Sequence, residues 1–256
     1  MDTDNNMASI DPVKYNLDSE FKFRCHSGLS CFTKCCRGIT IILTPYDIIR
    51  LKEILSLSSE EFLAIYTEPQ LLEKTDLPIV TLKLLDDEQK SCPFVRDDGC
   101  LVYTHRPTAC RYYPAGVASL NFKEDSDDQG FYFFVNEPHC LGFEEDKIWT
   151  IREWRIDQGV DIHDQINAGW MDLVVKKRSF PKNIMLTEKS KNMFFTACYD
   201  VDKFRRFIFE SSFLTRYKVD NETVEKIKKD DIALLEFAFG WLDTILFKNE
   251  QFKVSE

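Results

Sequence analysis

The spacing of apolar residues divides the chain into a front part of short strands and a back part of helices. In the front part, β-branched and aromatic residues cluster or alternate with polar ones over short runs, which is typical of strands. The segments with this pattern are residues 21–24, 38–43, 79–85, 92–95, 100–103, 117–122 and 131–136. We expect 79–85 to pair with 92–95, and 117–122 to pair with 131–136 across an acidic loop at 123–130. Residues 79–136 are therefore predicted to form a small antiparallel meander.

Two helices are expected between the first strands and this meander. Thr44 is a good N-cap, Pro45 suits the first helical turn, and Asp47 lies three residues after the cap. Ser58 and Glu61 have the spacing of a capping box, which predicts the start of the second helix.

The back part has apolar residues at helical spacing, and several of the runs follow a candidate N-cap: Asp161, Thr187, Asp200 or Asn221. The predicted helices are residues 147–158, 162–177, 188–197, 201–210 and 222–247. The predicted fold class is α+β: a small antiparallel β-meander with cysteine-bearing loops and flanking helices, followed by a helical C-terminal region. We expect residues 1–20 to be a loose lead-in, 21–160 a cysteine-cluster domain, and 161–256 a helical region packed on it.

Composition and charge narrow the classes of function. The chain is 44% hydrophobic with 21 Phe, enough for a buried core, and its formal charge is −10. A nucleic-acid partner would require a basic face or stripe, and the sequence has neither, so we expect no nucleic acid partner. No window reaches the about 18 apolar residues of a membrane span, and the N-terminus lacks a signal peptide pattern. We therefore expect a cytoplasmic protein without membrane contact, whose thiols stay reduced.

The cysteines are the main candidates for chemistry. Eight of the nine lie in the front part, in small groups separated by the predicted helices and strands. They are Cys25, Cys31, Cys35, Cys36, Cys92, Cys100, Cys110 and Cys140. Thiols gathered in this way in a chain without a secretory signal are more often metal ligands than packing residues. The sequence therefore predicts a metal site formed by these eight side chains.

The number and spacing of the cysteines bear on the kind of metal. Adjacent side chains diverge, so the pair Cys35 and Cys36 serves two metals, or two corners of a cluster, more readily than one ion. Eight thiols are also twice what one tetrahedral ion or one four-iron cluster needs. Pro93 follows Cys92, as proline follows a ligand in ferredoxins. These features favour an iron–sulfur cluster, with 4Fe-4S as the first choice, and zinc remains the alternative.

Nearby residues support a thiolate site. Arginines that would offset negative charge lie near the cysteines in the sequence, at Arg24, Arg37, Arg106 and Arg111. His26, His105 and His139 each lie within five residues of a cysteine, and imidazole is a common co-ligand.

Other interpretations explain fewer of these residues. Cys198, within an aromatic helix, is interpreted as a buried core residue. A catalytic thiol would need one Cys with a partner His, and redox-active dithiol exchange would leave most of the eight unexplained. The sequence has no Walker loop, no dinucleotide-binding glycine motif and no His-Glu-x-x-His.

The residues resemble the YkgJ-type cysteine-cluster family, the CxxCxxCC proteins, over about residues 21–160. The resemblance is carried by segments that combine cysteine with Arg, Pro and Gly. They are Phe23-Arg24-Cys25, Cys35-Cys36-Arg37-Gly38, Leu43-Thr44-Pro45-Tyr46-Asp47-Ile48, Cys92-Pro93-Phe94, Gly99-Cys100-Leu101-Val102-Tyr103, Arg106-Pro107-Thr108-Ala109-Cys110-Arg111-Tyr112-Tyr113-Pro114 and Cys140-Leu141-Gly142. The cysteine region is also similar to that of flagellin lysine N-methylases. The family's usual Cys-x2-Cys-x2-Cys-Cys is stretched here to Cys25-x5-Cys31-x3-Cys35-Cys36.

The resemblance implies zinc or iron chelation and supplies no reaction. Three hypotheses remain open: an iron–sulfur protein acting in electron transfer or protein modification, a structural zinc module, and a protein-modifying enzyme of the N-methylase kind. The expected partners are a metal ion or cluster and a protein substrate or redox partner. Whether the protein is an enzyme is left open.

Overall fold

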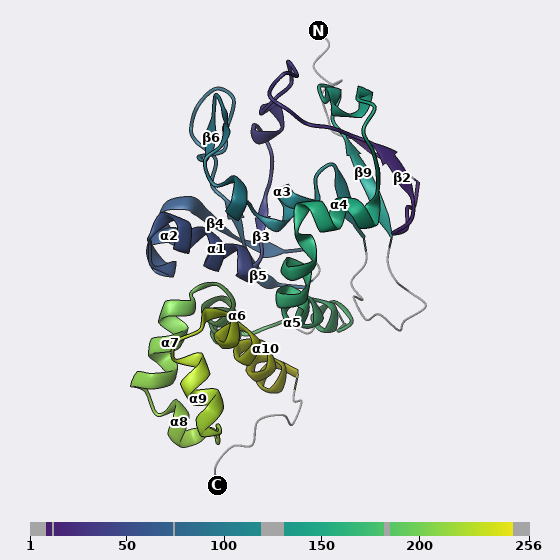
Figure 1. The fold of residues 1–256 in the computed structure, drawn as a ribbon. Coiled ribbons are helices and arrows are strands. Elements are labelled where there is room, and N and C mark those ends of the chain that lie inside the picture. Colours follow the sequence, from purple (N-terminus) through teal and green to yellow (C-terminus); the bar gives the residue numbers. More distant parts are fainter. Residues whose placement is uncertain (1–8, 12, 74, 119–130, 182–184, 248–256) are drawn as a thin grey trace. The chain divides into compact units, whose positions relative to one another are not determined.

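The computed structural model describes residues 9–11, 13–73, 75–118, 131–181 and 185–247 of the chain (Figure 1). The chain forms two compact units, each made of two separate segments. Unit 1 comprises residues 1–41 and 82–164, and unit 2 comprises residues 42–81 and 165–256. The segment 42–81 thus groups with the C-terminal helices, whereas the sequence places it within the cysteine-cluster domain. The fold class is α+β, as the sequence predicts.

Unit 1 consists of short strands and short helices joined by loops. Its strands are β1 (Ser9–Ile10), β2 (Glu20–Lys22), β6 (Val95–Arg96), β7 (Gly99–Cys100), β8 (Ala115–Val117), β9 (Tyr132–Asn136) and β10 (Ile148–Thr150). Its helices are α3 (Thr108–Tyr112), α4 (Ile151–Gln158) and the 3₁₀ turns η1 (Lys34–Cys36), η2 (Tyr103–His105) and η3 (Leu141–Glu144). The strands pair antiparallel in three small sheets, ordered β1-β9-β8, β10-β2 and β6-β7.

Aromatic side chains form the core that supports these sheets. Phe23 is 2% exposed and makes edge contacts with the rings of Tyr113, Phe143 and Trp154. The ring of Phe134 from β9 also contacts Phe143. Since all of these strands except β9 have only two or three residues and bury little surface, this aromatic packing holds the loops between them.

Unit 2 is mainly helical, with one sheet ordered β3-β5-β4. The strands are β3 (Ile42–Leu43), β4 (Thr67–Leu72) and β5 (Leu77–Leu82, ending at the unit boundary). The helices are α1 (Pro45–Leu55), α2 (Ser59–Tyr66), α6 (Glu188–Tyr199), α7 (Val201–Glu210), α8 (Phe213–Arg216), α9 (Asn221–Ile227) and α10 (Asp231–Phe247). Helix α5 (Val160–Arg178) crosses the boundary, and its residues from 165 onward belong to unit 2.

The helix starts follow the local signals in the sequence. Thr44 and Asp47 form a complete capping box at α1, and Ser58 and Glu61 form one at α2. Thr187 caps α6 through the backbone N–H of residue 190, as predicted. At α9 the cap is one residue earlier than expected, since Asp220 accepts from the N–H of residue 223.

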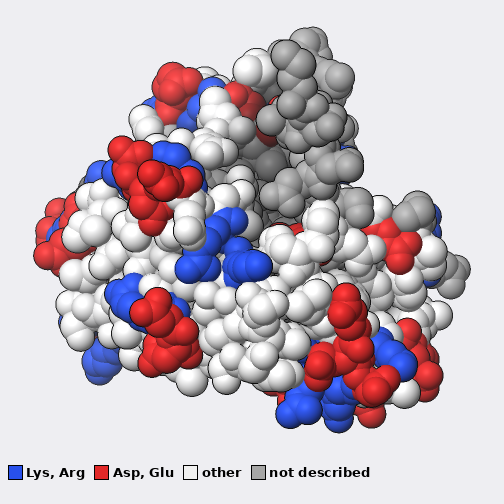
Figure 2. All heavy atoms as spheres, turned by 90° about the horizontal axis from the view of Figure 1, so that it is seen from above, with Lys and Arg blue, Asp and Glu red and all other residues white. Residues whose placement is uncertain are grey.

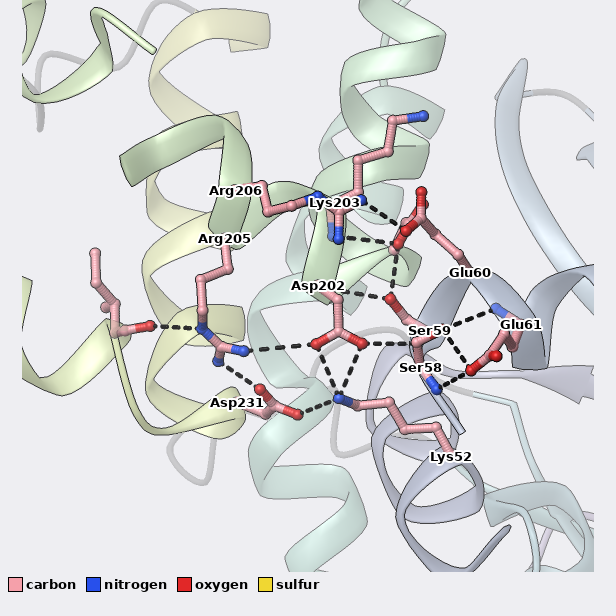
Figure 3. A network of polar contacts seen from close by, with 12 residues as sticks. Lys52, Ser58, Ser59, Glu60, Glu61, Asp202, Lys203, Arg205, Arg206 and Asp231 are labelled. Carbon is pink, nitrogen blue, oxygen red and sulfur yellow. Dashed lines mark hydrogen bonds and ion pairs between the residues drawn. The ribbon is translucent and has the colours of Figure 1, made fainter. Parts of the chain in front are cut away.

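A buried ionic network connects the helices of unit 2 (Figure 3). Lys52 of α1 lies between Asp202 of α7 and Asp231 of α10, with Nζ–O distances of 3.1 and 2.8 Å. Arg205 also pairs with Asp231, and the Ser59 backbone N–H donates to Asp202 at 2.7 Å. The network links residues far apart in the sequence, so it can set how α1, α7 and α10 pack within the unit.

Two predicted strand pairings have different outcomes. The hairpin of 79–85 with 92–95 is wrong, because β5 pairs with β3 and has β4 on its other side. The predicted pairing of 117–122 with 131–136 is confirmed where it begins, since Val117 lies opposite Tyr132 in β8–β9. Residues 119–122 of the predicted strand and the predicted loop 123–130 lie outside the described residues. The strands from residue 79 to 136 therefore belong to several small sheets and not to one meander.

Two predicted helices begin or break differently from the expectation. The segment from residue 147 starts with strand β10, and α4 begins only at Ile151, where Thr150 caps it. The predicted helix 222–247 is two helices, α9 and α10, separated at residues 228–230. Among the described residues, none of the helices combines the length and the apolar character required to cross a membrane.

Candidate metal centre

A small pocket in unit 1 has four cysteines among its eight lining residues. Its lining residues are Phe23, Cys25, Cys31, Cys35, Tyr113, His139, Cys140 and Gly142. Three predicted ligands from residues 25–35 therefore meet Cys140, which lies more than 100 residues further along the chain. The cavity is about 10 Å³, the space of roughly one water-sized sphere.

The pocket forms because two loops run side by side at this point. Cys25 and Cys31 follow β2, Cys35 lies in η1, and Cys140 is the N-cap residue of η3. The Arg24 N–H donates to the Gly142 carbonyl at 3.0 Å, which joins the two loops. The Leu141 N–H donates to the Cys31 sulfur at 3.3 Å.

Gly142 is required for this close approach. A Cβ at this position would lie 2.6 Å from Cε2 of Phe23, far inside van der Waals contact. Because Phe23 is held by three other rings, the glycine allows the loop after Cys140 to reach the loop before Cys25.

Three further cysteines form a second group beside the pocket. The Cys92 N–H donates to the Cys36 carbonyl at 2.8 Å, and Cys100 lies opposite Val95 in the β6–β7 hairpin. Burial raises the pKa of both thiols, and the backbone N–H groups of Phe94 and Val95 at Cys92, and of Val102 at Cys100, oppose that rise. Hydrogen bonds of this kind stabilise thiolates and are found around metal-bound sulfur.

Cys35 and Cys36 connect the two groups. Cys35 lines the pocket, whereas the charge of Cys36 acts on Cys92 and Cys100. The two adjacent side chains are hydrogen bonded to each other, which raises the pKa of Cys35 and lowers that of Cys36. Seven cysteines therefore form one continuous set of thiols.

Burial and mutual repulsion hold most of these thiols protonated in the absence of a cation. Burial, then the neighbouring Cys31 and Cys140, raises the pKa of Cys25 to about 11. Burial also raises the pKa of Cys92 to about 11, against the opposing backbone N–H groups. A bound cation would stabilise the thiolates, so metal binding at neutral pH should release protons.

The arginines have two different roles. Arg37 lowers the pKa of Cys36, and Arg106 together with Arg96 favours the thiolate of Cys100. Arg111 instead donates to three backbone carbonyls, those of residues 104, 106 and 158, at 2.7 to 3.1 Å. It is 9% exposed and fixes the loop between the hairpin and α3. The predicted charge compensation thus involves Arg37 and Arg106, while Arg96 was not foreseen.

The two remaining cysteines have different surroundings. Cys110 is half-buried in α3 and is not among the residues that line the pocket. Cys198 is fully buried in α6 of unit 2, where desolvation raises its pKa. This environment matches the interpretation of Cys198 as a core residue.

The sequence singled out neither Tyr113 nor Glu137, and it indicated His139 only as one of three histidines near cysteines. Tyr113 and His139 line the pocket, and the Tyr113 hydroxyl donates to Glu137 at 3.1 Å. Desolvation, then contact with Cys140, raises the pKa of Tyr113. The signal was the short run Glu137-Pro138-His139-Cys140, which places a carboxylate and an imidazole immediately before a thiol.

The sulfur and nitrogen donors of the pocket suit a thiophilic metal, but they do not converge on one position as the ligands of an ion would. Within the described residues, no group of three or more His, Cys, Asp or Glu side chains is arranged to hold an ion. Four cysteines and one histidine nevertheless line the same cavity, and thiolate and imidazole are ligands that zinc takes in proteins. The chemistry of the residues therefore fits zinc or iron.

The clustering of these cysteines corresponds to a known family. Residues 24–141 match the model of the CxxCxxCC family. The family model that matches this segment is described as a "Putative zinc- or iron-chelating domain". The resemblance inferred from the sequence is thereby confirmed, and the matched segment contains all eight predicted ligands, from Cys25 to Cys140. No curated protein and no solved structure gives a match to the chain.

Proposed function

We propose that the protein binds metal through the cysteines of unit 1 and that the bound group is an iron–sulfur cluster, with 4Fe-4S as the first candidate. The observation that carries this proposal is the continuous set of seven thiols, joined by Cys35 and Cys36. One tetrahedral ion uses four sulfurs, so the set is large enough for a cluster or for two centres. Cys110 is the eighth proposed ligand.

A cluster in this position would serve in electron transfer or in the modification of another protein. The chain's own residues would hold the cluster, shield it with the Phe23 ring and supply backbone N–H bonds to its sulfurs. The protein substrate or redox partner is proposed from this role alone. We place the protein in the cytoplasm, where thiols stay reduced.

A structural zinc site is the second candidate, and two observations favour it. The cavity of about 10 Å³ matches one ion better than a four-iron cluster, and His139 adds a nitrogen donor common in zinc sites. In this form the metal would fasten loops whose short strands bury little surface. An N-methylase-like enzyme using such a module remains a weaker alternative.

Anaerobic purification followed by absorption spectroscopy and analysis of iron, zinc and acid-labile sulfide tests the proposal. A brown protein with iron and sulfide in equal amounts supports the cluster. A colourless protein with one or two zinc ions per chain supports the second candidate. A protein that takes up neither metal under reducing conditions would contradict metal binding altogether.

A further inference from the structure

Two His–Glu pairs lie near the cysteines, and they differ in one decisive respect. His139 lines the thiol pocket, and its Nε2 lies 3.2 Å from Oε2 of Glu137. His26 lies 3.4 Å from Glu145, but its side chain is not part of the pocket lining. The first pair therefore lies where it could contact a metal bound in the pocket, and the second pair can serve as its control.

The Glu137 carboxylate is enclosed and held in place. Its side chain is 12% exposed, and Oε2 accepts a hydrogen bond from the Tyr113 hydroxyl at 3.1 Å. Its negative charge also disfavours the thiolates of Cys35 and Cys36. A buried carboxylate beside several thiols is unfavourable unless a cation offsets the accumulated charge.

The orientation of His139 leaves one ring nitrogen for a metal. Nε2 is buried and faces the carboxylate, although it makes no hydrogen bond in this arrangement. A small ring rotation would align an Nε2–H donor with Glu137 and leave the Nδ1 lone pair available. Histidines that bind metal commonly donate their other ring N–H to a carboxylate in this way.

We propose that His139 is a nitrogen ligand of the metal in the thiol pocket and that Glu137 is the positioning residue that orients it. This inference rests on the proposed metal-binding function and deepens it, because it makes the site a mixed sulfur and nitrogen site. Tyr113 acts through Glu137 by fixing the carboxylate. A nitrogen donor also gives the site a different preference among metals from an all-thiolate site.

The test uses the full chain labelled with ¹⁵N in histidine, loaded anaerobically with Zn²⁺ as the probe. Long-range ¹H–¹⁵N spectra report which ring nitrogen carries a proton or a metal, and a His139→Asn variant assigns the signals. We expect Nδ1 of His139 to shift to the metal-bound range while the nitrogens of His26 remain unchanged. Unchanged His139 signals in a zinc-loaded chain would overturn the inference.

Affinity measurements provide a second test that does not depend on the spectra. Glu137→Gln should lower the Zn²⁺ affinity by about 10- to 100-fold, and Glu145→Gln should leave it unchanged. Both variants retain side-chain size, and their circular dichroism verifies folding. Equal affinities in the two variants would contradict the role of Glu137. A wild-type chain that binds neither Zn²⁺ nor iron would overturn the proposed function and this inference together. Metal binding in which His139 is not a ligand would overturn only the inference.

Discussion

The Lys52 ionic network allows a quantitative prediction for unit 2. The Lys52 side chain is 10% exposed, and its two partners, Asp202 and Asp231, are 23% and 16% exposed. Lys52→Met keeps the length of the buried stem and removes only the charge that separates two carboxylates. Removing one partner of a buried ion pair costs about 3–5 kcal/mol, because it leaves an uncompensated charge.

The structure indicates a value somewhat below that range. Arg205 still pairs with Asp231 and lies 3.6 Å from Asp202, so part of the negative charge remains compensated. The partial exposure of both carboxylates also lowers the cost of the lost cation. We therefore expect Lys52→Met to lower the free energy of unfolding of unit 2 by about 2–4 kcal/mol.

The assay is urea unfolding combined with hydrogen exchange of the backbone amides of α1 and α7, which reports on unit 2 separately. Lys226→Met is the matched control, because Lys226 pairs with Glu222 on the exposed surface of the same unit. Surface pairs of this kind contribute little, so the control should unfold like the wild type. If both variants lose the same stability, the network in Figure 3 does not hold the helices as argued.

Three other perturbations test separate parts of the account. Burial tends to raise the pKa of Asp202, but hydrogen bonds from Ser59 and the charge of Lys52 lower it below the ordinary 3.8. The ionised Asp202 therefore stabilises the fold above pH about 4, and this stabilisation is lost as the pH falls through the lowered pKa that Asp202 has in the folded protein. Lys52→Met should reduce this loss of stability at low pH, measured by unfolding at a series of pH values. Gly142→Ala should destabilise unit 1 by about 1–3 kcal/mol through the clash with Phe23, and wild-type stability in denaturant would contradict the close approach. Arg111→Met should cost about 1–3 kcal/mol, because one buried and two part-buried carbonyls lose their donor, and a loss below about 0.5 kcal/mol would contradict that role.

The features that could be predicted from the sequence are mainly local. The helix starts at Thr44 and Ser58 were found because a cap and its partner lie within one turn of each other. The partner of β5 was missed, because its neighbour β3 precedes two intervening helices. Strand pairing over such distances depends on tertiary packing, which the alternation of residues does not specify.

The same distinction applies to the candidate site. Cysteine spacing identified the thiols, and four of them line one pocket. Spacing could not show that Cys35 faces the pocket while Cys36 acts on the hairpin cysteines, because this follows from the turn at η1. Tyr113 and Glu137 were missed for a related reason: their importance comes from loops that meet only in the folded unit.

The metal content of two cysteine variants tests the central claim most directly. Cys35→Ser removes a thiol at the junction of the two groups, and Cys198→Ala removes a buried thiol of unit 2 that has no role in the site. After anaerobic purification, we expect elemental analysis to find metal in the wild type and in Cys198→Ala, and a loss of most of it in Cys35→Ser. Equal metal content in all three proteins would contradict the claim that the thiols of unit 1 bind a metal together.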